Sequence, residues 1–384
     1  MPEPIQSFLL MLLAAGILAV LAGGPAIIYW WKLRSNREGV SAKPLAALFP
    51  KEADWVVPWS GWAILIVFAT AFLVPTLVQI ALGQSGFYGV LYGPDFPQKM
   101  TVDDWKDPVR KQAAHLRGLW SQSLAIPLLL VLIVGGLRLG SKATLPQIGL
   151  SRKRWQPNLL LGYLGWIVLA PLAFVVFVAA IALFAPNPDK HPLLDLGDQA
   201  ATREWIVFAL QAALFAPVLE ELLFRGLFLP WLIQSPERGA INSDMILPPR
   251  YRPHLCYAVA LLFSLQSPSL ADALQAGRWL DVIVGLAPCF FLVLLLPIFL
   301  LLPCRKRLQR WLHVSSPEAV RGWFASAVLF AAIHSNVWPS PIPLFVLALG
   351  LGWLAIRTRS IVPSIVVHMM FNAVAVVYLC LGGS

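Results

Sequence analysis

The sequence predicts an all-α polytopic membrane protein, a bundle of about 9–10 transmembrane helices with a polar intramembrane cavity. Hydrophobic residues make up 58% of its 384 residues and charged residues only 12%, which is about half the charged share of a soluble domain. Apolar windows of about 20 residues, long enough to cross a bilayer, recur along the chain. One of these windows carries three ionisable side chains near its centre, and this predicts a polar site within the membrane.

The apolar windows divide the chain into predicted spans. In chain order they are residues 8–31, 57–82, 119–137, 159–185, 205–233, 280–303, 323–338, 343–356 and 361–381, with a weaker tenth run at 255–265. The first run has no basic segment before it and is longer than the core of a signal peptide, so we expect it to remain as an anchor. We expect two N-terminal transmembrane helices in residues 1–82, an outside loop, one helix and a basic inside loop in residues 83–157, and the membrane core in residues 158–384.

Lys and Arg residues indicate the orientation of the spans. If the N-terminus is outside and all ten runs cross, most of the 29 Lys and Arg residues fall in inside loops, as the positive-inside rule requires. The basic inside loops account for most of the net charge of +10. Because the sequence has no module that combines basic and aromatic residues, nucleic acid is not an expected partner. A bacterial inner membrane is the expected location, because no organelle-retrieval signal ends the chain.

Two other features argue against simple metal or disulfide sites. The four cysteines are dispersed, with no CxxC pair, so neither disulfides nor a cysteine metal site is predicted. The outside loop at residues 186–204 contains Asp189, His191, Asp195 and Asp198, but these residues lack the helical spacing of metal ligands, and we do not predict a metal site there.

The ionisable residues of the central helix are Glu220, Glu221 and Arg225. Each would cost roughly 2.5–3.5 kcal/mol at the bilayer centre without a partner. Glu221 and Arg225 lie four residues apart with the acid first, the favourable order for an ion pair on one helix face. Glu220 is rotated by about 100° from Glu221 and has no partner in its own helix. The trio is either a structural polar contact between helices, or a site in which Glu221 and Arg225 support a chemically active Glu220.

Two further pairs stand in the last apolar spans. Phe330 and His334 are four residues apart, and so are His368 and Asn372, so each pair shares a helix face. A single histidine in an apolar helix is usually a packing residue. Two such helices together with a diacidic helix favour one shared site, which requires Glu220 to lie close to His334 or His368.

In order, the three patterns are EExxxR at Glu220 to Arg225, FxxxH at Phe330 to His334 and HxxxN at His368 to Asn372. Together they resemble the CAAX-protease and bacteriocin-processing family, also called the Abi family, of type II CAAX prenyl endopeptidase-like membrane proteins. The resemblance covers residues 159–377. The interval between the first two motifs is longer than the family's, as if an insertion occupied residues 234–321.

The resemblance implies an all-α bundle with a water-filled cavity that opens toward the cytoplasm, and endopeptidase activity that in eukaryotic relatives acts next to a prenylated cysteine. It implies that Glu220 is the catalytic glutamate and that His334 works with it on water. It also implies that His368 and Asn372 stabilise the oxyanion. The expected partners are the lipid bilayer and a peptide or protein substrate, for which prenylation is the family's best-known case.

Elementary chemistry agrees with this assignment, because peptide hydrolysis needs a base for water and donors for the developing negative charge. The sequence has no HExxH, GxGD or GxSxG motif, so a metal-independent glutamate mechanism without a cofactor is favoured. Zinc held by Glu220, His334 and His368 stays open as an alternative. So do a non-catalytic scaffold or immunity protein and, less favoured, a transporter, which would show repeated halves.

Overall fold

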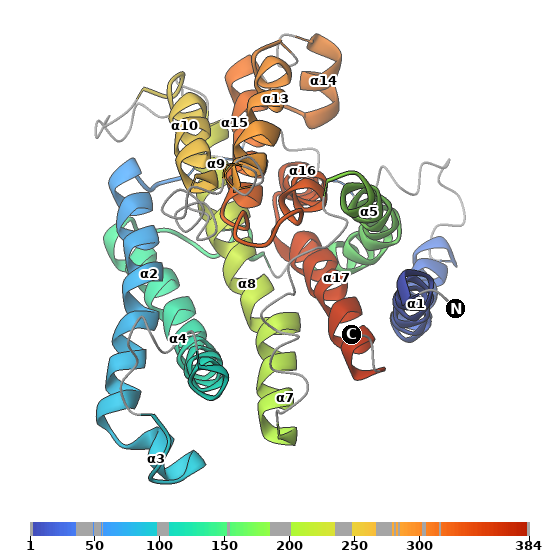
Figure 1. Ribbon diagram of the computed structural model, residues 1–384. Helices are drawn as coiled ribbons and strands as arrows, with labels where there is room; N and C mark the ends of the chain where they lie inside the picture. The colour runs from blue at the N-terminus through green and yellow to red at the C-terminus, as the bar shows by residue number, and fades with distance from the viewer. Residues whose placement is uncertain are drawn as a thin grey trace.

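The computed structural model is helical throughout its described part, with no strand there (Figure 1). It describes residues 3–35, 49, 55, 57–97, 107–151, 154–184, 201–234, 248–265, 279, 282, 285–301, 305–314 and 316–381. The N-terminal helices are α1 (Glu3–Ser35), α2 (Gly61–Gln84), α3 (Phe87–Tyr92), α4 (Pro108–Gly140) and α5 (Trp155–Phe184). One long helical span follows, made of α7 (Thr202–Leu210), η4 (Gln211–Phe215), α8 (Ala216–Glu221), η5 (Leu222–Phe228) and α9 (Leu229–Ile233). The remaining helices are α10 (Arg252–Ser264), α13 (Ala287–Leu301), α14 (Lys306–Leu312), α15 (Pro317–Ala332), α16 (Pro341–Thr358) and α17 (Val362–Cys380).

The protein is an integral, multi-pass membrane protein, as its sequence predicts. In the described residues, seven helices are long and apolar enough to cross a bilayer, or up to eight if the bent pair α13 and α14 is one span. This number is smaller than the predicted 9–10. The difference arises because the predicted runs at 255–265 and 323–338 form α10, of 13 residues, and α15, of 16 residues. Both helices are shorter than about 17 residues, the lower end of the range that crosses the hydrocarbon core.

Capping side chains determine where several helices begin. The side chain of Ser60 accepts a hydrogen bond from the backbone N–H of Ala63 at the start of α2. Asp107 does the same for α4, and Ser316 for α15. Proline follows the cap directly in α4 and in α15, where its missing N–H would have no helical partner. Serine or aspartate before an apolar run is therefore the local signal for these helix starts.

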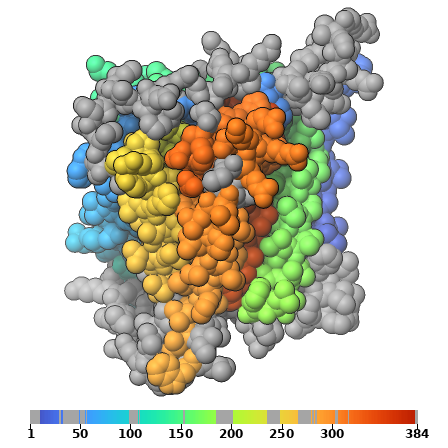
Figure 2. Space-filling view, turned by 90° about the horizontal axis from the view of Figure 1, so that it is seen from above, coloured from blue at the N-terminus to red at the C-terminus, as the bar shows by residue number. Residues whose placement is uncertain are grey.

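Helix α15 is buried along most of its length, and it packs against α10 and α16. Helix α17 packs against α5, and α2 packs against α4 (Figure 1). Figure 2 shows α10 beside the orange helices of the α13–α15 region, with the blue N-terminal helices at the two edges. The outer helices expose large apolar side chains, such as Val20 and Val168, as expected for surfaces in contact with lipid.

Loops at one end of the bundle interlock. The backbone N–H of Ile361, before α17, donates to the carbonyl of Gly149 (3.1 Å), and the indole of Trp55 donates to the carbonyl of Gln147 (2.8 Å). Gly149 has φ of +82°, and an added Cβ would lie 2.9 Å from the Ile361 nitrogen, so glycine is required for this close approach. The basic loop predicted at residues 140–157 thus packs on the start of α17 and helps to set the position of that helix.

Candidate active site within the membrane

The span from Thr202 to Ile233 is not a regular α-helix, because two of its segments are π-helical. In the first, η4, the N–H of Ala216 donates to the carbonyl of Gln211, five residues earlier. In the second, η5, the N–H of Leu229 donates to the carbonyl of Phe224. A proline follows each of these donors, Pro217 and Pro230. Such widened turns often occur at functional sites, since they change the direction in which side chains and carbonyls point.

The predicted ion pair between Glu221 and Arg225 is confirmed. Arg225 Nη1 lies 3.0 Å from Glu221 Oε1, and the two side chains are 1% and 0% exposed. A buried guanidinium needs further partners. The guanidinium of Arg225 lies 4.4 Å from the ring centroid of Phe330, and its second amino group donates to the carbonyl of Ala348 (3.5 Å). Arg225 therefore links α16 and the FxxxH motif of α15 to the central span.

His368 on α17 lies beside both glutamates of the EExxxR motif. Its Nδ1 lies 2.9 Å from Glu221 Oε1, and its Nε2 lies 3.8 Å from Glu220 Oε2. Because an ionised carboxylate only accepts hydrogen bonds, Nδ1 donates to Glu221 and Nε2 faces Glu220. The side chain of His368 is 4% exposed, whereas that of Glu220 is 27% exposed. Glu220 is the one carboxylate of the pair that a water or a substrate can reach.

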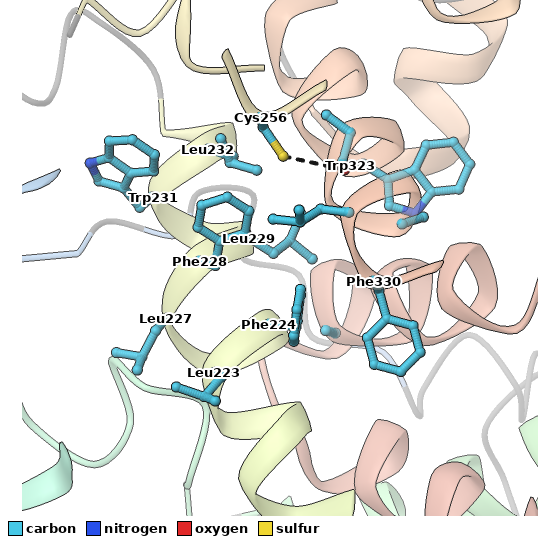
Figure 3. Close-up of a cluster of buried hydrophobic side chains, with 14 of the residues drawn as sticks. Leu223, Phe224, Leu227, Phe228, Leu229, Trp231, Leu232, Cys256, Trp323 and Phe330 are labelled. Carbon is cyan, nitrogen blue, oxygen red and sulfur yellow. Dashed lines mark hydrogen bonds between the residues drawn. The ribbon is translucent and has the colours of Figure 1, made fainter. Parts of the chain in front are cut away.

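Phe330 lies at the centre of these groups and is fully buried. Its ring centroid is 5.1 Å from that of His334 and 5.8 Å from that of His368. Figure 3 shows Phe330 close to Phe224, beside an apolar cluster that includes Phe228, Leu229 and Trp323. The rings of Phe224 and Phe330 meet edge to face with centroids 5.2 Å apart. Aromatic contacts thus hold α15 against the second π-helical segment.

His334 follows the end of α15, and its Nδ1 lies 2.8 Å from the carbonyl of Phe330. A carbonyl accepts hydrogen bonds, so Nδ1 carries the proton, and the other ring nitrogen of the neutral imidazole is left as an acceptor. Within the described residues, His334 makes no hydrogen bond or ion pair with Glu220. The structure brings both histidines to Phe330, but only His368 lies directly beside the glutamates.

Asn372 lies one helical turn beyond His368 on α17, and its Nδ2 donates to the carbonyl of Ala212 (2.9 Å). The backbone of η4 supplies no N–H to the Ala212 carbonyl. The N–H of Ala216 already donates to Gln211, and the next residue is Pro217, which has no N–H. The π-helical register and the proline together leave the Ala212 carbonyl to Asn372. The second N–H of the amide is left for another acceptor.

No local sequence signal pointed to Ala212 or Ala348. Both residues take part through backbone carbonyls, which every amino acid has, so residue type carries no information about them. Pro217 shows in the sequence that one helical N–H is missing, but a regular α-helix would leave the Ala213 carbonyl without a donor, and only the π-helical register transfers this effect to Ala212.

The residues proposed as an alternative zinc site were Glu220, His334 and His368. In the described part of the chain, no group of three His, Cys, Asp or Glu side chains has an arrangement suited to a metal ion. The acidic outside loop, at residues 186–204, lies mostly outside the described residues.

A comparison with protein-family models identifies residues 202–374 as similar to the Rce1-like family, described as type II CAAX prenyl endopeptidase Rce1-like. The matched segment contains all three motifs and the long interval between the first two. It begins at the first residue of α7, so helices α1 to α5 lie outside it, although the sequence resemblance was expected to begin at residue 159. Comparisons with curated proteins and with solved structures found no match.

Proposed function

We propose, from the similarity of residues 202–374 to the Rce1-like family of type II CAAX prenyl endopeptidases, that this membrane protein is an intramembrane endopeptidase. It hydrolyses a peptide bond in a membrane-associated protein or peptide, using water activated by Glu220 and His334. The observation that carries the proposal is that Glu220, with 27% of its side chain exposed, lies 3.8 Å from the buried His368. A carboxylate that solvent reaches next to fixed hydrogen-bond donors has what peptide hydrolysis requires.

The water is activated by proton transfer to a base. Glu220 is the base, because Glu221 is occupied by Arg225 and His368. His334 is oriented by its hydrogen bond to the Phe330 carbonyl, which leaves its other nitrogen to accept a hydrogen bond from the same water. After attack on the scissile carbonyl, the proton on Glu220 passes to the nitrogen of the leaving amine.

The oxyanion is stabilised by His368 and Asn372. Asn372 offers the amide hydrogen that Ala212 does not use. His368 donates to the oxyanion through Nε2 only when both ring nitrogens carry protons, because Nδ1 already donates to Glu221. The positive charge of that imidazolium is balanced locally, since two carboxylates and one guanidinium surround it. The four groups are then neutral as a set, which lowers the cost of burying them.

The mechanism we propose is metal-independent and uses no cofactor. Peptidase activity of the purified protein should therefore survive dialysis against a strong chelator of divalent metals, with kcat within about twofold of the untreated value. The matched control is a zinc peptidase treated in the same way, which loses activity. Loss of activity that zinc restores would contradict the metal-independent mechanism and support zinc bound by the alternative site.

The proposal extends to the class of substrate and to the orientation of the protein in its membrane. A substrate that carries a prenyl group near the scissile bond is the family's best-known case, and it would reach the site from the lipid phase. We place the protein in a bacterial inner membrane with its N-terminus outside. The interlocked loops near Gly149 and Ile361, which lie at one end of the bundle, are assigned to the cytoplasmic side because basic residues are concentrated in the loops predicted inside.

The experiment that tests the proposal compares newly formed peptide termini in cells that express the wild type or Glu220→Gln at equal abundance. His334→Ala is a second inactive variant, and Glu318→Gln, at the partly exposed start of α15, is the matched control. Termini found with the wild type and the control, but lost in both site variants, would support the proposal and identify substrates and cleavage sites. Profiles that do not differ, although the variants fold, would favour a non-catalytic scaffold or immunity protein.

A further inference from the structure

Helix α4 lies outside the matched segment, yet it contacts α7, η4 and α8 of the central span. Three polar side chains join the two elements. Ser123 Oγ donates to Gln211 Oε1 (2.6 Å), and Gln211 Nε2 donates to Gln122 Oε1 (2.8 Å). Both ends of the Gln211 amide are therefore satisfied by α4. Polar side chains are costly in an apolar span, so three of them that hydrogen-bond to one another across two helices suggest a specific role.

Gln211 is the first residue of η4, the π-helical segment next to the candidate site. Its own carbonyl accepts the N–H of Ala216 in the five-residue register. Its neighbour Ala212 holds Asn372 through the carbonyl that this register leaves available. The side chain that α4 holds and the carbonyl that Asn372 uses are thus on adjacent residues of one turn. Any rotation of that turn moves the Asn372 amide.

A second contact attaches the beginning of the central span to the same N-terminal part of the chain. Glu204, in the first turn of α7, is 2% exposed and accepts a hydrogen bond from the Tyr92 hydroxyl (2.9 Å). Tyr92 in turn accepts one from the indole of Trp120 on α4 (2.8 Å). This contact runs through Tyr92 of α3 to the beginning of α7, two helical turns before Gln211, and it involves no residue of η4.

We infer that α4 positions the oxyanion donor Asn372 through Gln122, Ser123, Gln211 and the carbonyl of Ala212. These are positioning residues, and the inference rests on the proposed peptidase function. The N-terminal helices are then part of the catalytic apparatus of this chain, because they maintain the π-helical register from which the oxyanion donor is held.

The first test is a double-mutant cycle for cleavage of a farnesylated, CAAX-terminated fluorogenic peptide by the protein in lipid vesicles. Gln211→Leu keeps the volume and suits an apolar span, and it should lower kcat about 10-fold with little change in KM, as expected for a small misplacement of a catalytic group. Asn372→Ala should lower kcat about 100-fold. The double variant should be no slower than Asn372→Ala, because Gln211 acts only through Asn372.

Matched variants separate positioning from stability. Ser123→Ala should lower kcat, whereas Ser123→Thr, which keeps the hydroxyl, should restore it. Tyr92→Phe removes another interhelical hydrogen bond of the same N-terminal part, and it should leave kcat unchanged. If Gln211→Leu slows the Asn372→Ala enzyme by the same factor as it slows the wild type, the inference is wrong and the three polar residues only stabilise the fold.

The second test does not depend on activity. In protein labelled with ¹⁵N-asparagine, the side-chain signal of Asn372 is identified by its loss in Asn372→Ala. We expect Gln211→Leu to shift this signal and to speed the hydrogen exchange of its amide, and Tyr92→Phe to do neither. An unchanged signal in Gln211→Leu would overturn the inference. If the signal shifts but no variant, including Glu220→Gln, affects cleavage, the positioning stands and the proposed peptidase function fails.

Discussion

Glu220 and Glu221 are adjacent and identical in type, yet their surroundings assign them different roles. Glu221 is completely buried and accepts hydrogen bonds from Arg225 and His368, so it supports other groups. Glu220 lies 3.8 Å from His368 and is partly exposed. A helix turns by about 100° between neighbours, and this rotation alone takes one carboxylate into the protein and leaves the other accessible.

Removal of the Arg225 guanidinium should destabilise the protein strongly. Arg225→Met keeps the apolar volume but removes the guanidinium partner of the buried Glu221 carboxylate, and breaking such a pair costs about 3–5 kcal/mol. Arg321→Met is the matched control. Arg321 lies 3.6 Å from Glu318 in a pair that is 19% and 34% exposed, and loss of such a pair costs about 1 kcal/mol or less. Unfolding in detergent measures the free energy of unfolding of each variant. Equal decreases in the two variants would contradict the structural role given to Arg225.

At the scale of the helix, the site depends on departures from α-helical geometry. The central span has two π-helical segments. In each, an N–H donates to the carbonyl five residues earlier, and the residue after that donor is a proline. Proline both removes an N–H and forbids a regular turn before it, so a carbonyl becomes available to a side chain from another helix. The Ala212 carbonyl and Asn372 are the instance that the structure documents.

Replacement of Pro217 by alanine should therefore impair the candidate site without harming the fold. Pro217→Ala supplies an N–H that competes with Asn372 for the Ala212 carbonyl, and we expect kcat for cleavage of the fluorogenic peptide to fall about 10-fold. Thermal stability should stay equal or rise, since proline is unfavourable within a helix. The control is Pro317→Ala at the start of α15, where the missing N–H has no helical partner. Unchanged kcat in Pro217→Ala would argue against the role of the proline.

At the scale of the whole molecule, one end of the bundle gathers loops from distant parts of the chain. Arg252 donates to the carbonyl of Trp231 (2.9 Å), Trp59 to that of Leu227 (3.2 Å) and Ile361 to that of Gly149 (3.1 Å). These contacts connect the ends of the central span, α10, α2 and α17. Because they bring together segments on which basic residues are frequent, the charge of this end is a property of the assembled fold.

The predicted orientation can be measured by labelling of single cysteines in intact cells, in a variant without the native cysteines. A membrane-impermeant thiol reagent should label Asp95→Cys from outside, and it should label Arg250→Cys only after the membrane is opened. Both positions are exposed in the structure, so accessibility within the protein is matched. The reverse pattern would invert the orientation and would contradict the assignment of the basic end to the cytoplasm.

The amino-acid sequence by itself determined the properties that depend on local spacing and on apolar content. The membrane class follows from the long apolar windows, and the pairing of Glu221 with Arg225 follows from their distance of four residues along one helix. In the described residues, seven or eight helices are long enough to span, and the apolar runs at α10 and α15 form shorter helices; α15 is mostly buried in protein, whereas α10 exposes Leu255 and Leu262. Burial in protein and burial in lipid produce the same hydrophobic windows.

Only the tertiary structure decided which groups meet. His368 contacts Glu221 across 147 residues, and Phe330 lies between Arg225 and both histidines although it comes from another helix. Asn372 was expected to act beside His368, and the structure attaches it to a backbone carbonyl of the first π-helical segment. The physical reason is that the crossing of α17 over the central span, and the register of that span, arise from packing among several helices, which no local repeat in the sequence encodes.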